Sequence, residues 1–216
     1  MPPFPPELEE LYRPLWQQVA SLFEKWKTFV TLFGTSDADL QVVNRAAGVF
    51  FGLIQEVMMG DLLLSASRLT DRMGTGQRTN LSLEALVRGI DATQHPSLRA
   101  VAEETLIAAS QKAAFAHGWR NRQIAHLDRR TALGSHAEPL PEYTRAEVQQ
   151  ALDAIAAVVN AVSVHFGESP TAFEDVISAP GDAESLVKRL RDGLELQDWR
   201  FRSRMNGGTG ILPPEV

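Results

Sequence analysis

Apolar residues recur at helical spacing along most of this chain, and this periodicity constrains the fold more than any other feature. In the first long segment they alternate at spacings of four and three, which places one set on a single helix face: Leu15, Val19, Leu22, Trp26, Phe29 and Phe33. Gly34 follows, at a position where glycine commonly ends a helix. No segment alternates with a period of two for long enough to predict a strand. The sequence therefore predicts an all-α protein.

The same periodicity predicts helices further along the chain. A long one begins at Ser36 and carries an apolar stripe over residues 40–69 that includes Phe50 and Ile54, with Gly60 as the expected bend. A short helix is expected in "LSLEALVRGI". A longer helical region begins at Pro96, rich in small residues at its middle, and is expected to have a kink or an irregular turn at Gly118.

Two more helices complete the predicted order. Thr144 and Glu147 form a capping box at the start of an apolar stripe over residues 148–166. A last helix is expected over about residues 182–196, before a loose tail. We therefore predict a domain of long antiparallel helices over residues 1–166, and a C-terminal helix with its tail over residues 167–216.

Composition limits the classes of function. The chain has 216 residues, 44% of them hydrophobic, which is enough to bury a core. Its net charge of −6 argues against a general polyanion binder, so nucleic-acid contact would require a local basic patch. The absence of cysteine removes disulfides, thiolate metal sites and cysteine nucleophiles. The sequence also contains no Glu-x-x-His, H-E-x-x-H, Walker A or G-x-G-x-x-G pattern, so we expect neither a metal nor a cofactor.

The most apolar window, "AAGVFFGLIQEVMMGDLLL", is interrupted by Gln55, Glu56 and Asp61. We interpret it as a buried helix and not as a membrane span. The N-terminus, "MPPFPPELEE", lacks the basic and apolar regions of a signal peptide. We therefore expect a cytoplasmic protein without membrane contact.

One short stretch, "GWRNRQIAHLD", concentrates polar groups in this otherwise apolar helical pattern. Arg122 and His126 are four residues apart and would share a helix face. Arg120 and His126 are six apart, so they converge only if the backbone is irregular near Gly118 or if a second chain contributes. The stretch is either a phosphate site, with arginine holding the anion and histidine moving a proton, or a solvated face with ordinary helix ion pairs.

The segment "WRNRQIAHLD" resembles the R-x(4–6)-H motif of the HEPN superfamily, which comprises all-α domains. It is most similar to the abortive-infection, AbiU-type branch. Two earlier segments, "ASRLTDR" and "NLSLEAL", are also similar to that branch and precede the motif in the same order. The resemblance spans about residues 15–166 and implies a HEPN-like helical bundle.

The resemblance also implies an activity and a set of site residues. Active members of the superfamily are metal-independent endoribonucleases that work as dimers, with two motifs facing across the interface. By that resemblance His126 would be the general base on the ribose 2′-hydroxyl, and Arg120 would stabilise the phosphoryl charge. Asn121 would orient the phosphate or the histidine. RNA is the implied substrate, a homodimer the implied assembly, and an antitoxin protein from a neighbouring gene a candidate partner.

Other HEPN members have lost catalysis and bind RNA or a partner protein, which is the competing hypothesis for this chain. Candidate RNA-binding residues outside the catalytic set are Arg122, Arg68, Arg200 and Arg202. The last two lie in "QDWRFRSRMN", where arginines alternate with aromatic residues as in single-strand binders. The interpretation that we favour for that stretch is a segment whose aromatics pack on the bundle while its arginines face water. For "SRLTDR" we favour a structural role for Asp71, and His117 is expected to be a partly buried neighbour of the motif.

Overall fold

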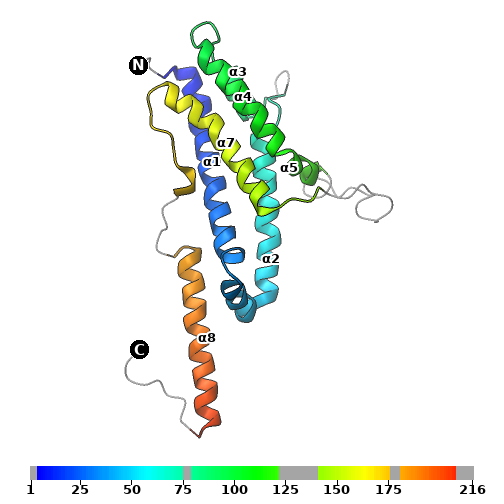
Figure 1. Cartoon of the computed structure of the whole chain (residues 1–216), viewed down its shortest axis with the longest axis vertical. Helices are drawn as coiled ribbons and strands as arrows, with labels where there is room; N and C mark the ends of the chain where they lie inside the picture. Colours follow the sequence, from blue (N-terminus) through cyan, green and yellow to red (C-terminus); the bar gives the residue numbers. More distant parts are fainter. Residues whose placement is uncertain (1–3, 75–78, 122–140, 176–180, 208–216) are drawn as a thin grey trace, which may run out of the picture. The chain divides into compact units, whose positions relative to one another are not determined.

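The computed structural model describes residues 4–74, 79–121, 141–175 and 181–207, and all regular structure in these ranges is helical (Figure 1). The elements are α1 (Pro6–Phe33), α2 (Asp37–Leu69), α3 (Leu83–Arg88), α4 (Pro96–Lys112), α5 (Ala114–Trp119), α7 (Arg145–His165), a 3-10 turn (Phe173–Asp175) and α8 (Ala183–Met205). The predicted all-α, HEPN-like bundle is confirmed.

The chain forms two compact units that do not follow chain order. The first comprises the described residues of Met1–Lys25 and Met59–Val176. The second comprises those of Trp26–Met58 and Ile177–Val216.

In the first unit, α4 and α7 lie side by side and run in opposite directions (Figure 1). At one end His165 of α7 hydrogen-bonds His95, the residue that caps α4, over 3.1 Å between Nε2 and Nδ1. At the other end the Lys112 ammonium donates to the Gln150 side-chain oxygen at 2.7 Å. The two pairs therefore fix the antiparallel register of these helices.

Small residues line the buried face of α4 and its continuation. Four alanines are fully buried: Ala102, Ala109, Ala113 and Ala116. Helix α7 buries branched residues, including Leu152, Ile155 and Val159. Short side chains on α4 let the neighbouring helix approach closely, while branched residues of α7 fill the core.

The segment after α7 is held against the same unit. Phe173 is buried and stacks on Phe23 of α1, with ring centroids 5.6 Å apart. Trp16 donates its ring N–H to the Thr171 hydroxyl at 3.0 Å. This segment thereby closes the apolar space between α1 and α7.

The predicted helix starts are confirmed by their contacts. Thr144 accepts from the Glu147 backbone N–H at 3.2 Å, and the Glu147 carboxylate accepts from the Thr144 backbone N–H at 2.7 Å. The carboxylate of Glu147 has a lowered pKa because that backbone N–H and the Thr144 hydroxyl donate to it. Pro96 occupies the first turn of α4.

In the second unit, α8 is longer than the helix predicted over residues 182–196, because it continues to Met205. No glycine or proline between residues 194 and 205 ends it. The alternation of aromatic and basic residues is therefore wound into a helix. Arg45 of α2 pairs with Asp198 of α8 at 2.9 Å, and Arg191 pairs with Asp39.

The irregularity in α2 is at Ala47, with φ −163° and ψ 63°, and not at the predicted Gly60. A non-helical residue shifts the phase of those that follow, so Phe51 is buried where the stripe predicted Phe50. Val49, Leu53 and Val57 are exposed, the first by 94%. The interpretation of this window as a buried helix is therefore wrong over its middle.

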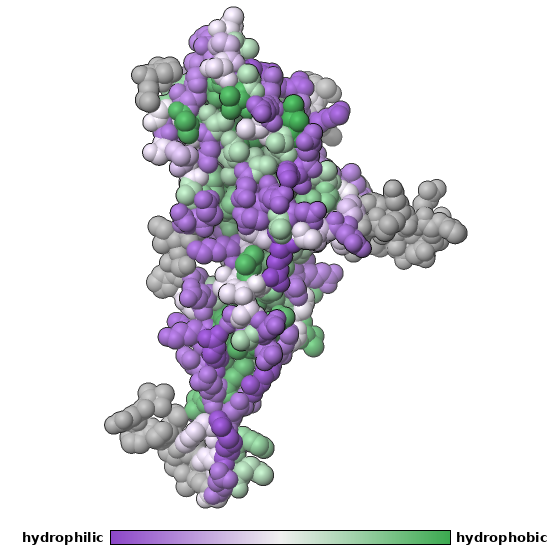
Figure 2. All heavy atoms as spheres, viewed as in Figure 1, coloured by the Kyte–Doolittle hydropathy of each residue, from purple (hydrophilic) through white to green (hydrophobic). Residues whose placement is uncertain are grey.

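By length and composition, α2 is also the one described helix that would be able to cross a membrane, which is weak evidence when it stands by itself. On the face shown in Figure 2, hydrophilic and hydrophobic side chains are interspersed. The cytoplasmic location stays a prediction.

The alanine-lined face of α4 gives a matched stability test. Ala109 is fully buried, whereas its neighbour Ala108 is exposed. We expect Ala109→Leu to lower the free energy of unfolding by about 1–3 kcal/mol, because extra carbons would force the packed helices apart. Ala108→Leu is expected to change it by less than about 0.5 kcal/mol. Urea unfolding followed by circular dichroism measures both, and equal losses would contradict close packing at Ala109.

Candidate functional site

The helical backbone is irregular on both sides of Gly118. Helix α4 ends at Lys112, and Ala113 leaves helical geometry with φ −89° and ψ 5°. The short α5 then follows, and Arg120 with Asn121 continues it as a π-helical turn. The expected kink at Gly118 itself is wrong, since this residue lies inside α5. Single π-helical turns within helices often occur at functional sites.

The Arg120 side chain reaches from α5 to the end of α2. Its Nη1 donates to the Asp71 carboxylate in an ion pair and to the Ser67 hydroxyl at 3.5 Å. Ser67 is fully buried, whereas the Arg120 side chain remains 30% exposed. The guanidinium is therefore anchored on one side and open to solvent on another.

His117 lies between the same two segments, and hydrogen bonds fix its tautomer. The Thr70 hydroxyl donates its only proton to the Ala66 carbonyl at 2.8 Å, so it must accept from the His117 Nε2–H, 3.0 Å away. Nδ1 is then the unprotonated nitrogen, and it accepts from the Ser67 hydroxyl at 3.1 Å. The imidazole is neutral, and both of its nitrogens are occupied.

Electrostatics favour the same neutral state. Burial lowers the pKa of His117 below its ordinary value, and the positive charge of Arg120 lowers it further. The Asp71 carboxylate, 3.8 Å from Nδ1, opposes these effects. His117 thus orders the end of α2 against α5, which agrees with its interpretation as a partly buried neighbour of the motif.

These side chains form one group, called here the polar cluster: Ser67, Thr70, Asp71, His117 and Arg120. Three of them, Ser67, Thr70 and Asp71, come from "SRLTDR" at the end of α2. Thr70 and Asp71 follow Ser67 by three and four residues, the spacings at which side chains meet along a helix. That spacing was the available signal, but the sequence does not show that the face meets α5.

The structure describes some of the predicted site residues and not others. Arg120 is in the polar cluster, and Asn121 follows it as an exposed residue. Arg68 is exposed on α2 next to Ser67. Arg122 and His126 lie outside the residues that the structure describes.

Arg200 and Arg202 are exposed on α8, in the second compact unit. The neighbouring Phe201 is 66% exposed. For this side chain, the expectation that the aromatics of "QDWRFRSRMN" pack on the bundle is wrong.

The two ends of the segment that carries His126 lie together. Trp119 donates its ring N–H to the Pro141 carbonyl at 2.8 Å. Tyr143 stacks on Phe115, with centroids 5.2 Å apart, and meets Trp119 edge-on. The chain therefore leaves α5 beside Arg120 and returns to the same helix before α7 begins.

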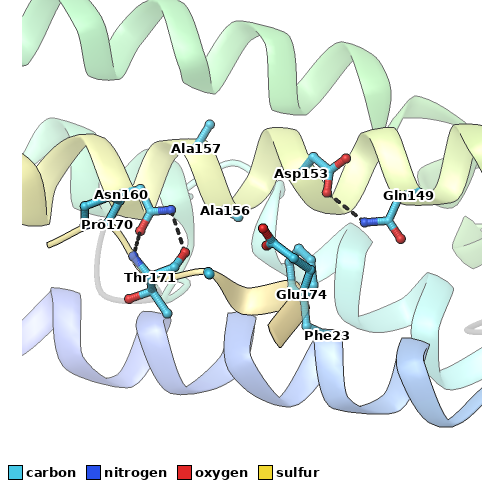
Figure 3. Close-up of a pocket in the computed structure, with 10 residues that line it drawn as sticks. Phe23, Gln149, Asp153, Ala156, Ala157, Asn160, Pro170, Thr171 and Glu174 are labelled. Carbon is cyan, nitrogen blue, oxygen red and sulfur yellow. Dashed lines mark hydrogen bonds between the residues drawn. The ribbon is translucent and has the colours of Figure 1, made fainter. Parts of the chain in front are cut away.

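A separate cavity of about 580 Å³ lies in the first unit between α7, α1 and the segment after α7 (Figure 3). Asn160 bonds both backbone groups of Thr171, and Gln149 donates to Asp153 at 2.7 Å. The charged groups at this cavity are the carboxylates of Asp153 and Glu174, which would repel phosphate. Its polar groups secure the segment after α7, so the polar cluster is the better candidate for an anion site.

Comparison with known proteins defines the class. The all-α bundle has an arginine at the end of α5 that is anchored by residues at the end of α2. This arginine begins an R-x5-H pattern, the spacing of HEPN domains. The family model HEPN_AbiU2, described as AbiU2, matches residues 5–186. The chain belongs to the AbiU2 family of HEPN domains. No curated protein and no solved structure matches it.

The neutral state of His117 predicts a pH dependence of stability. Because its pKa in the folded state lies below the ordinary value of about 6.5, the unfolded chain binds more protons as the pH falls through that range. The stabilisation is complete above about pH 6.5 and is lost as the pH falls through the lowered pKa. We expect wild type to lose more stability between pH 7.5 and pH 5 than His117→Gln, as measured by urea unfolding. Equal losses in the two proteins would show that groups other than His117 cause the pH dependence of stability.

Proposed function

We propose that this chain is a metal-independent endoribonuclease of the abortive-infection or toxin type. Membership of the AbiU2 family supports the class of activity. The observation that carries the proposal is the state of Arg120, which is anchored to Asp71 and still partly exposed. A fixed cation at a protein surface suits the developing charge of a phosphoryl group.

In the proposed reaction His126 removes the proton of a ribose 2′-hydroxyl. The 2′-oxygen then attacks the adjacent phosphorus, the bond from phosphorus to the 5′-oxygen breaks, and that oxygen takes up a proton. The products are a 2′,3′-cyclic phosphate and a 5′-hydroxyl end. Arg120 stabilises the charge on the phosphoryl oxygens, and Asn121 orients the phosphate or the histidine. Because the nucleophile is the 2′-hydroxyl, DNA is not a substrate.

The proposed assembly is a homodimer with two motifs facing each other. Arg120 and His126 are six residues apart, and six residues of regular helix would not place them on one face. A partner chain would remove this difficulty by supplying the arginine or the histidine of each site.

The alternative is a HEPN module without catalysis that binds RNA or a partner protein. The exposed α8 residues Arg200, Phe201 and Arg202 favour it, because cations beside an aromatic side chain suit a single strand. The two functions differ in their dependence on His126.

Cleavage assays separate these functions. In EDTA, wild-type protein is expected to cut single-stranded RNA and leave 2′,3′-cyclic phosphate ends. We expect His126→Ala to lower the rate by about 10²–10⁴-fold and Arg120→Ala by about 10²–10³-fold. The matched control is Arg13→Ala, which removes an exposed arginine paired with Glu9 on α1 and should leave the rate unchanged. If wild type cuts none of several RNA pools, or if the site variants cut as fast as wild type, the proposed catalytic function is wrong. The binding module is then the remaining hypothesis.

Mixing two inactive variants tests the shared site. If each site takes Arg120 from one chain and His126 from the other, every Arg120→Ala/His126→Ala heterodimer contains one intact site. Random subunit exchange should then restore about a quarter of wild-type activity. Sites contained within single chains would give no recovery. A monomeric mass at micromolar concentration in light scattering would also contradict the homodimer.

A further inference from the structure

The contacts of Arg120 use one end of its guanidinium. Both described contacts, to Asp71 and to Ser67, are made by Nη1. Among the residues that the structure describes, no acceptor bonds Nε or Nη2 of Arg120. These two nitrogens form the edge that arginine presents to the paired oxygens of a phosphate or carboxylate.

We propose that Asp71 is a positioning residue, which holds Arg120 by Nη1 so that the Nε–Nη2 edge receives one phosphodiester group of RNA in a bidentate contact. This inference rests on the proposed function for its substrate class. It gives Asp71 a role in binding and cleavage that the sequence did not assign to it.

The surroundings of Asp71 fit a fixed anchor. Its side chain is 23% exposed and lies directly after α2, whose Ser67 makes the second contact with Nη1. The Ser67 hydroxyl proton is directed to His117, so a lone pair of the same oxygen remains for the arginine. An arginine that is held in place before binding loses less side-chain freedom when the phosphate arrives.

Net charge and positioning predict opposite changes in RNA affinity when Asp71 is neutralised. The direction of the change therefore tests the proposal. Asp71 is an anion beside the proposed phosphate position, so its neutralisation should tighten RNA binding if only the net charge matters. If positioning dominates, neutralisation should weaken binding and slow cleavage, because Arg120 loses its charge-assisted anchor.

The experiment is a double-mutant cycle with Asp71→Asn and Arg120→Ala. Binding is measured by fluorescence anisotropy with a 2′-O-methyl RNA oligonucleotide, which keeps its phosphodiesters but has no 2′-hydroxyl to attack. Cleavage of unmodified RNA gives kcat and KM. We expect Asp71→Asn to weaken binding and lower kcat on the order of tenfold in the wild-type background, and to change neither in the Arg120→Ala background.

Two further variants make the test specific. Asp61→Asn removes an aspartate of α2 in the same unit, paired with Lys25 at 2.7 Å, and should leave binding and kcat unchanged. Arg120→Lys keeps a cation for Asp71 but lacks the two-nitrogen edge, so it should bind no better than Arg120→Ala. Full recovery of binding by lysine would overturn the bidentate contact.

The outcomes separate this inference from the proposed ribonuclease. If wild type binds the 2′-O-methyl RNA with the expected coupling but cuts no RNA, the enzyme fails and the positioning role stands. If wild type cuts RNA but Asp71→Asn binds more tightly, or acts equally in both backgrounds, the positioning role is wrong. The absence of any binding of wild type to the 2′-O-methyl RNA would overturn it as well.

Discussion

The close packing of α4 on α7 is the constraint on which the first unit depends. Buried alanines on α4 let the two backbones approach, and the end pairs His95–His165 and Lys112–Gln150 fix their antiparallel register. The alanine face continues through Ala113 and Ala116, so it also sets the position of α5. The polar groups at the end of α5 therefore follow within two turns of buried apolar residues.

The polar cluster shows how buried and partly buried polar groups satisfy one another. Each hydrogen has one acceptor: Thr70 donates to a carbonyl, His117 to Thr70, and Ser67 to His117. The arginine enters this chain of donors only through Nη1, and its charge is balanced by Asp71. Such a network gives α2 and α5 one favoured arrangement, because any other would leave a buried donor or acceptor unpaired.

The helices, the capping box at Thr144 and the family were predictable from the sequence, because each depends on local residue spacing or on a local sequence motif. Prediction from the sequence failed where the backbone departs from a regular helix. The irregular Ala47 moved burial from Phe50 to Phe51, and the break after α4 came at Ala113 instead of Gly118. Both errors came from placing the irregularity at a glycine, although in each case an alanine adopts it, exposed at Ala47 and buried at Ala113.

The sequence by itself determined the all-α fold, the helix starts and the presence of an R-x5-H motif with Asn121 after the arginine. Only the tertiary structure decided what surrounds that arginine. The contact of "SRLTDR" with the end of α5 joins residues that are far apart along the chain. Arg120 and Asp71, for example, are separated by 49 positions. Periodicity reports which face of a helix is apolar, whereas the partner of a polar side chain depends on how helices pack, and no spacing within one helix encodes it.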